Sequence, residues 1–240
     1  MAILPVRVDS RRLPRKALLA ESGQPLFLHT YAAARGAASL AAVYIATDSD
    51  EVAAAAAAVG APVIRTSARP RTGSERCAEA LTHVADADVV IDVQGDWPEV
   101  DPGDLDRLVA SLADGRLPMA TLAAPLRDGA AFTDPNVVKV VRRRDGHAMY
   151  FSRAPIPYGA DAHDYPVLRH IGVYGFTRPA LAGITDLPSS GLAEAESLEQ
   201  LRFLENGIPM LVLDAQGDPW GIETRSDYDG FLHRLRRHHP

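Results

Sequence analysis

The sequence predicts an α/β protein with a layered, mixed sheet. Through the first half of the chain, short buried apolar runs alternate with helix-like segments, which is typical of parallel strands connected by helices. The second half has consecutive strand-like runs with a hairpin signal between two of them, which indicates antiparallel pairing. We therefore expect a three-layer, Rossmann-like unit with a small antiparallel lobe at 127–171.

Strands of the first half are expected where short apolar runs occur, at 2–6, 41–46, 62–65 and 89–93. Helices are expected between and after them, at 25–35, 49–59, 74–83 and 101–113. Their ends carry ordinary signals: Pro25 in a first turn, Ser49 or Asp48 as a cap, and Gly36 and Gly60 after the last turns. This half, 1–126, is expected to hold the ligand, because ligands of such sheets lie beyond the carboxyl ends of strands.

The second half continues with strand-like runs at 119–124, 137–141 and 147–151. Arg144-Asp145-Gly146 separates the last two runs and is a typical hairpin turn. A strand at 170–176, a helix at 191–205, a strand at 210–213 and a closing helix at 226–237 complete the prediction. All 240 residues are expected to form one domain, in which 172–240 returns from the lobe to the main sheet. The tail histidines, His238 and His239, are not expected to be ligands.

Composition excludes several classes of protein. The chain has 25 Lys and Arg against 31 Asp and Glu, a net charge of −6, which argues against a general nucleic-acid binder. The single Cys77 excludes an internal disulfide and a cysteine-rich zinc site. No apolar run approaches the roughly 20 residues that span a bilayer, and the first residues lack the layout of a signal peptide. We expect a cytoplasmic protein with no nucleic-acid or membrane partner.

One segment carries much more positive charge than the rest of the chain. Directly after the first expected strand, ten positions hold one acid, Asp9, and five basic residues: Arg7, Arg11, Arg12, Arg15 and Lys16. The segment has neither a Walker glycine pattern nor a Gly-x-Gly-x-x-Gly turn. Arginine and lysine side chains would therefore have to neutralise a bound phosphate. A solvated basic turn is the alternative, and residue types alone favour neither.

Motifs along nearly the whole chain resemble those of one family. The segment LPVRVDSRRLPRKALL, which begins at Leu4, is similar to the I-P-A-R-x-x-S-x-R-L-P-x-K-x-L signature of sugar-activating nucleotidyltransferases. Further motifs follow in the family's order: ATD at 46–48, GSER at 73–76, VQGD at 93–96, NVVKVV at 136–141, YFSRA at 150–154, RHIGVYG at 169–175 and LEQLR at 198–202. They most resemble the 3-deoxy-manno-octulosonate (Kdo) cytidylyltransferases. Arg15 and Ala17 stand where that family has glycine and proline.

The resemblance implies a nucleotidyltransferase fold with a site for CTP. It assigns nucleotide binding to Pro5, Arg7, Ser10, Arg12, Lys16, Gly73, Ser74 and Gln94, and catalysis to Arg7, Arg12, Lys16 and Asp96. Without the resemblance, Ser74 is interpreted as a helix N-cap, and Cys77 as a packed small residue.

A magnesium site is a second implication of the resemblance. Asp96 ends an expected strand, and Mg²⁺ takes one or two carboxylates together with water and phosphate oxygens. The family's second metal carboxylate lies in a G-V-D-T-P-E-D segment, and the equivalent segment here, 221–227, has Glu223 in place of the aspartate. From local sequence alone, Asp96 is explained equally well by a turn with Gly95.

A third implication concerns the acceptor. The resemblance assigns recognition of a sugar acid to residues in three of the motifs: Arg153, His170, Tyr174, Glu199 and Gln200. The residues alone favour a core histidine at His170 and an exposed helix face at Glu199 and Gln200. Two departures from the family motifs concern acceptor recognition. Ala193 replaces the glutamate of a Leu-Glu pair, and Trp97 replaces a glutamate beside Asp96, which indicates either packing or a reshaped acceptor pocket.

Together these implications predict a cytidylyltransferase that joins CMP from CTP to a 2-ulosonic acid such as Kdo and releases pyrophosphate. A homodimer formed through the small lobe is expected from the family. The same chemistry on another acidic acceptor is the alternative. Two other classes stay open: a non-catalytic homologue that has kept the fold, and a dinucleotide oxidoreductase, against which the missing Gly-x-Gly-x-x-Gly argues.

Overall fold

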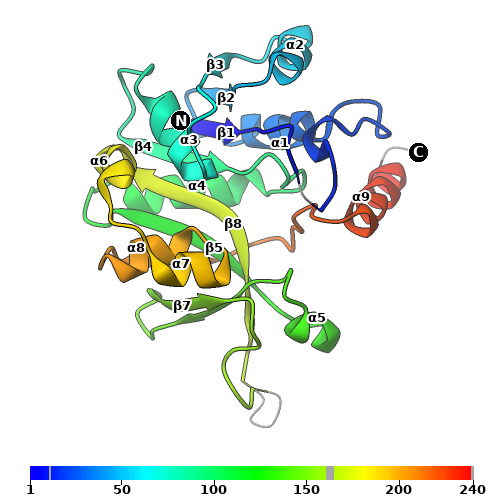
Figure 1. The fold of residues 1–240 in the computed structure, drawn as a ribbon. Coiled ribbons are helices and arrows are strands. Elements are labelled where there is room, and N and C mark those ends of the chain that lie inside the picture. The colour runs from blue at the N-terminus through cyan, green and yellow to red at the C-terminus, as the bar shows by residue number, and fades with distance from the viewer. Residues whose placement is uncertain (11, 161–164, 239–240) are drawn as a thin grey trace.

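The computed structural model describes residues 1–10, 12–160 and 165–238 and has a three-layer α/β fold around one sheet (Figure 1). Its strands are β1 Ala2–Pro5, β2 Val43–Thr47, β3 Val63–Arg65, β4 Val89–Val93, β5 Met119–Pro125, β6 Lys139–Arg142, β7 Ala148–Ser152, β8 Leu168–Thr177 and β9 Met210–Asp214. Its helices are α1 Leu26–Arg35, α2 Asp50–Ala58, α3 Gly73–Leu81, α4 Pro102–Leu112, α5 Gly129–Thr133, α6 Arg178–Ala182, α7 Gly191–Glu196, α8 Gln200–Glu205 and α9 Arg225–His238, with 3₁₀ turns η1 Lys16–Leu18 and η3 Gly183–Asp186. Arg11 and His239, which the sequence predictions include, lie outside the described residues.

The sheet is mixed, which confirms the predicted fold class. Its main path runs β3-β2-β1-β4-β8-β5-β9, and β6 and β7 join it beside β8. β8 is antiparallel to both β4 and β5, whereas β3, β2, β1 and β4 pair in parallel, as do β5 and β9. Because β1 and β4 are adjacent and parallel, they end at the same edge of the sheet. The basic segment and Asp96 follow these two strands, so the topology brings them together.

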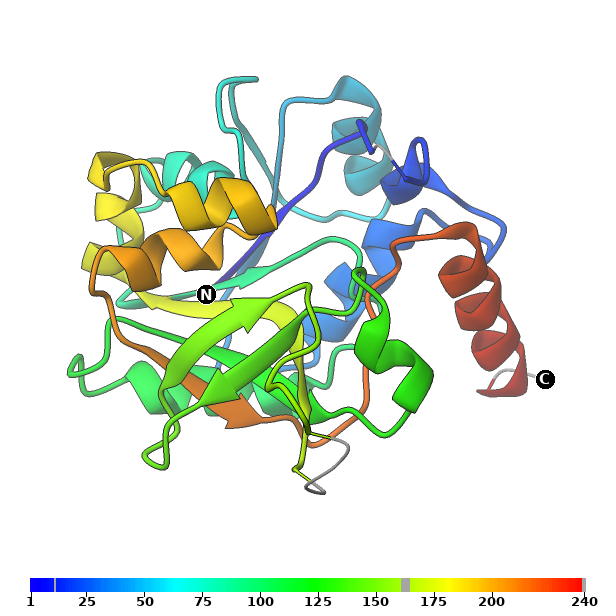
Figure 2. The same cartoon turned by 60° about the horizontal axis from the view of Figure 1, so that its bottom comes forward.

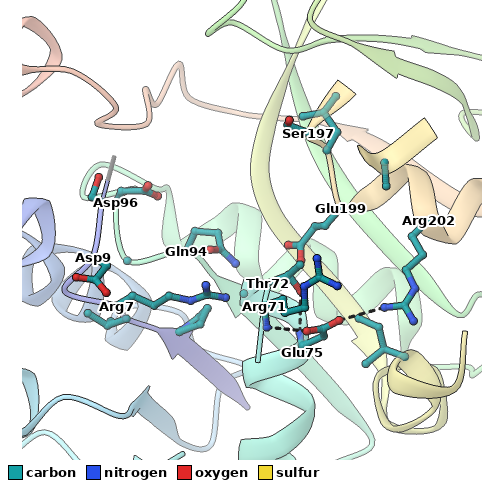
Figure 3. A pocket seen from close by; sticks show the side chains of 18 of the residues that line it. Arg7, Asp9, Arg71, Thr72, Glu75, Gln94, Asp96, Ser197, Glu199 and Arg202 are labelled. Carbon is teal, nitrogen blue, oxygen red and sulfur yellow. Dashed lines mark hydrogen bonds and ion pairs between the residues drawn. The ribbon is translucent and has the colours of Figure 1, made fainter. Parts of the chain in front are cut away.

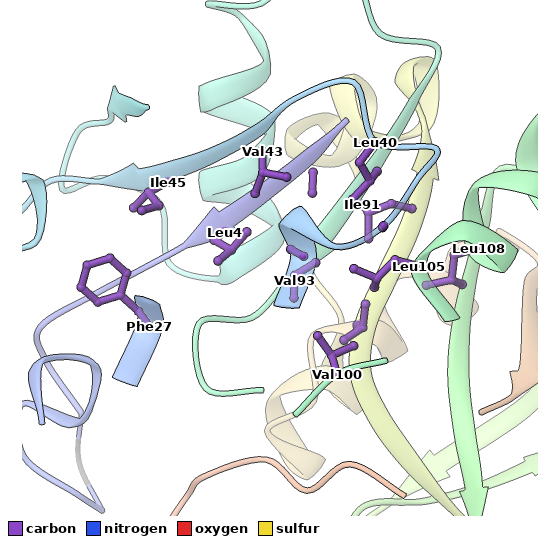
Figure 4. Close-up of a cluster of buried hydrophobic side chains, with 14 of the residues drawn as sticks. Leu4, Phe27, Leu40, Val43, Ile45, Ile91, Val93, Val100, Leu105 and Leu108 are labelled. Atoms are coloured by element: carbon purple, nitrogen blue, oxygen red, sulfur yellow. The ribbon is translucent and has the colours of Figure 1, made fainter. Parts of the chain in front are cut away.

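Helices cover both faces of the sheet. Strand alternation directs Leu4 and Ile91 to the face covered by α1, α2 and α4, and Ile3 and Val90 to the face covered by α3, α6 and α8. Figure 4 shows part of the first cluster, in which Leu105 of α4 lies beside Ile91 of β4. The two buried clusters give the three layers that the sequence predicts.

Local capping explains where two of these helices begin. The Ser49 side chain caps α2, as expected. The cap of α3 is Thr72, whose hydroxyl accepts from the Glu75 N–H, whereas Ser74 lies inside the first turn and is fully buried. The N-cap interpretation of Ser74 is therefore wrong, because a residue two positions earlier takes that role and leaves the Ser74 hydroxyl to other partners.

The helix expected at 191–205 is two helices. Ser197 breaks it with a left-handed backbone, φ 52° and ψ 47°, and the turn lets Leu198 and Leu201 enter the core. Glu199 then stands at the start of α8 instead of on a continuous helix face. The short helices α5 and α6 were not anticipated, because five-residue helices carry too weak a periodic signal.

The predicted hairpin is present between β6 and β7, which pair antiparallel. The Arg143 N–H donates to the His147 carbonyl at 2.7 Å, and Gly146 has the positive φ, 87°, that favours glycine. A single bridge from His147 to Leu211 ties the hairpin to β9, and β7 packs beside α8 (Figure 2). The hairpin is therefore attached to the main sheet by several contacts.

The closing helix α9 lies at the opposite end of the molecule from α6 (Figures 1 and 2). Tyr228 and Phe231 of this helix share a buried cluster with Leu13 of the basic segment and Leu26 of α1. This cluster holds the basic segment against the fold. Within 1–10, 12–160 and 165–238, no helix is both long and apolar enough to cross a membrane.

β8 is packed tightly where it passes α4, and this can be tested at Gly175. A Cβ at Gly175 would lie 2.8 Å from Leu112 Cδ1 and 3.3 Å from Ile91 Cδ1. We expect Gly175→Ala to lower the free energy of unfolding by about 1–2 kcal/mol through overpacking. Chemical denaturation measures this. Gly129→Ala is the matched control, since a Cβ there meets nothing within 4 Å; equal effects of the two substitutions would contradict this packing.

Candidate active site

A cavity of about 800 Å³ opens where β1 and β4 end, between the basic segment, the start of α3 and the turn from α7 to α8 (Figure 3). Eight residues predicted from sequence line it: Pro5, Arg7, Ser10, Lys16, Gly73, Gln94, Asp96 and Glu199. The other predicted residues do not line it: Arg12, Ser74, Arg153, His170, Tyr174, Gln200 and Glu223. The predicted set is therefore divided between the cavity wall and the structure around it.

Arg7 reaches from the end of β1 into the cavity (Figure 3). Burial lowers the pKa of its guanidinium, and the nearby Arg76 cation lowers it further, while Glu199, Asp48 and Glu75 act in the opposite direction. A guanidinium stays charged even after such a shift. Arg7 is therefore a half-buried cation that an anion in the cavity would stabilise, as expected for a residue that binds phosphate.

Lys16 is the most buried cation at the mouth of the cavity, with 9% of its surface exposed. Its Nζ lies 2.6 Å from Asp96 Oδ2 and 3.2 Å from Glu223 Oε2. Burial alone would lower the pKa of Lys16, but Asp96 and then Glu223 raise it above its ordinary value. Arg12 adds a second cation, because its Nη2 lies 3.2 Å from the same Glu223 oxygen.

A backbone contact brings the two carboxylates together across 127 positions of sequence. The Ile222 N–H donates to the Asp96 carbonyl at 2.9 Å, and this places Glu223 beside Asp96. The Asp227 carboxylate then accepts from the Glu223 and Thr224 N–H groups at 3.0 and 2.7 Å. The segment before α9 is therefore fixed on both sides of Glu223.

Trp97 packs between two glycines instead of lining the cavity. A Cβ at Gly172 would lie 3.0 Å from Trp97 Nε1, and one at Gly221 would lie 3.1 Å from Cζ2. The indole thus joins the loop after β4 to β8 and to the segment that carries Glu223. Of the two interpretations of Trp97, packing is the one that the structure bears out.

The donor set suits a hard divalent cation. Asp96 and Glu223 both contact the Lys16 ammonium group, so both carboxylates face one position that a cation occupies. In the described part of the chain, no group of three or more His, Cys, Asp and Glu side chains could enclose a metal by itself. Two carboxylates with phosphate and water oxygens completing the shell are what Mg²⁺ prefers, so the residues fit.

A buried polar cluster forms the floor of the cavity. The Ser74 hydroxyl lies 3.2 Å from Asp92 Oδ2 and 3.1 Å from Glu199 Oε1, and Gln94 Nε2 donates to Asp92 Oδ1 at 2.7 Å. Burial raises the pKa of Asp92 well above its ordinary value, and burial also raises that of Glu199. A Cβ at Gly73 would lie 2.3 Å from Gln94 Nε2, so glycine is required for Gln94 to lie flat on α3.

Two ionisable side chains of this site were missed in the sequence. Asp92 is fully buried in β4, and a carboxylate inside the apolar run Val89–Val93 is the signal that could have identified it. Glu75 accepts from the Arg71 N–H at 2.7 Å and from Arg202 Nη1 at 3.1 Å (Figure 3). Arg71 and Arg202 both line the cavity. Only the folded chain brings these three residues together.

The remaining predicted acceptor residues are not among those that line the cavity. Arg153 donates to the Glu196 and Pro135 carbonyls at 2.8 and 2.7 Å; burial and the neighbouring Arg12 cation lower its pKa. Tyr174 and Gln200 are 4% and 2% exposed. An exposed helix face at Gln200 is therefore wrong, because the break at Ser197 turns this residue inward. Direct contact of these side chains with an acceptor stays a prediction.

His170 has the surroundings of a core histidine. Its Nε2 lies 3.0 Å from Thr121 Oγ1, and its ring packs against Phe151 and Tyr174 at centroid distances of 4.9 and 5.4 Å. Burial, with a smaller contribution from Arg169, lowers the pKa of His170 to about 3. The imidazole is therefore neutral at physiological pH, and it would serve an acceptor as a neutral hydrogen-bonding group.

This neutral His170 predicts a specific dependence of stability on pH. Below about pH 6.5 the unfolded chain binds a proton at His170, whereas the folded chain does not until about pH 3. Lowering the pH through this window therefore favours unfolding, by about 2 kcal/mol at pH 5. His170→Gln should remove this part of the loss, so denaturation at pH 7 and pH 5 should give a smaller difference for the variant. Identical differences would contradict a buried neutral imidazole.

Comparisons with known proteins agree with this geometry. A cytidylyltransferase family model matches residues 1–212. The chain is 43% identical to a 3-deoxy-manno-octulosonate cytidylyltransferase of Chlorobium limicola, over 98% of this chain and 96% of that protein. It is 39% identical to an 8-amino-3,8-dideoxy-manno-octulosonate cytidylyltransferase of Shewanella halifaxensis, over 94% of each.

A solved structure extends the likeness to three dimensions. CMP:2-keto-3-deoxy-manno-octonic acid synthetase complexed with CTP superposes with a TM-score of 0.91 at 35% identity, covering 99% of this chain and 98% of that one. A cytidylyltransferase of Leptospira borgpetersenii, at 16% identity and a TM-score of 0.64, shares the fold alone. By these matches the chain belongs to the cytidylyltransferase family and is a nucleotidyltransferase.

Proposed function

We propose that this enzyme transfers CMP from CTP to a hydroxyl of a 2-ulosonic acid, Kdo or its 8-amino analogue, and releases pyrophosphate. The observation that carries the proposal is the group of Lys16, Asp96 and Glu223, of which Lys16 and Asp96 line the same cavity as Arg7. The names of the relatives at 43% and 39% identity support both the nucleotide and the acceptor class.

The triphosphate would bind to the basic segment. Arg7 is half-buried in the cavity, and Lys16 and Arg12 both contact Glu223. These cations offer the phosphates charge-assisted hydrogen bonds, and their charge stabilises the pyrophosphate that leaves. Mg²⁺, held by Asp96 and Glu223, would add positive charge on the phosphate oxygens. Once Asp96 and Glu223 are neutralised by Mg²⁺, Lys16 would be free to bind phosphate oxygens in place of these two carboxylates.

The reaction needs positioning more than covalent chemistry. The acceptor oxygen attacks the α-phosphorus in line and its hydroxyl proton is released to solvent. The bond from the α-phosphorus to the β-phosphate oxygen breaks, pyrophosphate leaves, and no bond to the enzyme forms. Such transfer depends on orientation and charge neutralisation. Glu199 and Gln94 line the cavity and would orient the acceptor. Arg153, whose charge interacts with those of Arg12 and Glu223, would neutralise the acceptor carboxylate.

The cluster at the mouth also argues against a non-catalytic homologue. Two carboxylates around one buried ammonium group contribute little to stability, because their desolvation offsets the attraction between the charges. Such a group is therefore more simply explained by a role in binding or catalysis. Trp97 fills space between Gly172 and Gly221, so its substitution for glutamate leaves the cavity open. The departures from the family are thus compatible with turnover.

Substitution of the clustered residues tests the proposal. We expect Asp96→Asn and Lys16→Ala each to reduce pyrophosphate release about 100-fold or more, because each removes charge at the reacting phosphates. Circular dichroism should report an unchanged fold. Arg15→Gly is the control, since Arg15 is paired with Glu51 on the surface and its φ of 54° suits glycine; it should keep wild-type turnover. Near-normal turnover of folded Asp96→Asn would contradict the assignment.

An acceptor panel identifies the substrate. Wild-type enzyme with Mg²⁺, each of the four nucleoside triphosphates and a series of acidic sugars is analysed by product mass. We expect a CMP-linked 2-ulosonic acid from CTP. Release of pyrophosphate with another acid points to a specialised acceptor, and no release with any acceptor would establish a non-catalytic homologue.

We further propose a homodimer that forms through the small lobe and works in the cytoplasm. Met149 and Tyr158 of the lobe are 59% and 102% exposed, and a partner subunit that packs on the lobe would cover them. The fully buried free Cys77 is compatible with a reducing compartment.

Light scattering should give twice the chain mass of 25.8 kDa. Met149→Arg should shift the protein toward monomer, because it buries a charge in the interface. Val59→Arg is the control, because Val59 is similarly exposed (53%) and lies at the C-terminal end of α2, outside the lobe. It should leave the mass measured by light scattering unchanged. A monomeric wild-type protein at micromolar concentration would rule out the dimer.

A further inference from the structure

The Ser74 hydroxyl lies between two carboxyl groups in the floor of the cavity. Its Oγ is 3.2 Å from Asp92 Oδ2 and 3.1 Å from Glu199 Oε1. Ser74 and Asp92 are fully buried, so bulk water cannot separate the groups. Asp92 comes from β4, Ser74 from α3 and Glu199 from the start of α8, and these three elements hold the arrangement in place.

The number of protons that Ser74, Asp92 and Glu199 can share in hydrogen bonds limits their total charge. A serine hydroxyl has a single proton to donate, and an ionised carboxylate has none. With both Asp92 and Glu199 ionised, Ser74 could donate to only one of them, and its lone pair would face the lone pair of the other. An unpaired buried carboxylate is very costly. Both contacts are hydrogen bonds only if one of the two carboxyl groups carries a proton and donates it to Ser74.

The surroundings decide which carboxyl group holds that proton. Glu199 accepts from the Ser74 N–H at 3.4 Å and from the Thr72 hydroxyl, and Arg7 lies near enough to favour its charged form. Asp92 is fully buried and receives one strong donor, Gln94 Nε2, on Oδ1. Asp92 Oδ2 is therefore the atom that holds the proton. The resulting hydrogen bonds run in one direction, from Asp92 Oδ2–H to Ser74 Oγ–H to Glu199.

We propose that Asp92 is a positioning residue, held in its neutral form, that orients the Glu199 carboxylate toward the acceptor through Ser74. This deepens the proposed function, since it rests on Glu199 contacting a sugar acid in the cavity. Asp92 Oδ1 also accepts from Gln94 Nε2 at 2.7 Å, so the same residue contacts a second side chain that lines the cavity.

The arrangement makes acceptor binding sensitive to a rise in pH. Burial, and then the Glu199 charge, raise the pKa of Asp92; below that pKa the proton is present, and as the pH rises through it the proton leaves. Ser74 then has two charged neighbours and Glu199 loses its fixed orientation. The titratable and charged groups that face Asp92 and Glu199 are Cys77 and Arg76 of α3, Tyr174 of β8 and Arg7 after β1. Burial raises the pKa of Cys77 and of Tyr174 as well.

Carbon-13 NMR of the aspartate carboxyl carbons tests the proton directly in the wild-type protein. The Asp92 carbon, assigned through its backbone, should have the chemical shift of a neutral carboxyl at pH 7 and move only on raising the pH. An Asp92 carbon with the shift of an ionised carboxylate at pH 7 overturns the inference. This readout needs no turnover, so it is separate from the outcome of the acceptor panel.

Kinetics of two variants test the positioning role once the panel has identified an acceptor. Asp92→Ala should raise the acceptor KM about tenfold, the loss expected for one hydrogen bond to a charged group, with little change in the KM for CTP. Asp92→Asn should restore the acceptor KM, because its amide donates to Ser74 as the neutral carboxyl does. The acceptor KM of Asp92→Asn should also stay constant as the pH rises. The wild-type KM should rise at the pH where the Asp92 carbon changes its chemical shift.

A different pattern overturns the positioning role. If folded Asp92→Asn loses as much acceptor affinity as Asp92→Ala, the wild type requires a charged aspartate. If the acceptor KM of Asp92→Asn still rises with pH as that of the wild type does, a group other than Asp92 causes the rise. If Asp92→Ala does not fold, Ser74→Ala replaces it, because it breaks the same connection; an unchanged acceptor KM in that variant overturns the role as well.

Discussion

The ammonium group of Lys16, shared by Asp96 and Glu223, is the interaction on which the rest of the site depends. Lys16 places one cation 2.6 Å from Asp96 and 3.2 Å from Glu223, which offsets the repulsion between the two carboxylates. The cluster joins three distant parts of the chain: the basic segment, the loop after β4 and the segment before α9. The Ile222 N–H to Asp96 carbonyl bond and the Trp97 indole then hold those parts in register.

The basic segment bears strain in order to place Lys16. Arg15 has a left-handed backbone, φ 54°, at the position where the family has glycine, and such a conformation costs about 1 kcal/mol for a residue with a Cβ. The turn directs Lys16 inward at η1 and Arg15 outward, where it pairs with Glu51 on the surface. An exposed ion pair of this kind offsets only part of the strain. The geometry of the site is therefore maintained by the buried cluster of Leu13, Leu26 and α9 and not by the turn itself.

Sequence patterns predicted the order of the main helices and strands and the mixed sheet, because alternation of apolar runs and helix caps such as Ser49 are local properties. They failed where tertiary packing decides. Nothing local marks Ser197 as a left-handed break, and Leu198 entering the core is what turns Gln200 inward. Of the site, the motifs identified Arg7, Lys16, Asp96 and Glu199, which line the cavity. Asp92 was missed although a buried strand contains it, since its role depends on partners 18 and 107 positions away.

The central claim is that Asp96 and Glu223 act on one shared cation and its phosphates. The most direct test is a double-mutant cycle on pyrophosphate release, with Asp96→Asn, Glu223→Gln and the double variant measured with CTP, Mg²⁺ and the acceptor. If the carboxylates act as one unit, the double variant should be no slower than the worse single variant, because residues that act together are strongly non-additive. Losses that multiply would show two independent residues and contradict a shared site.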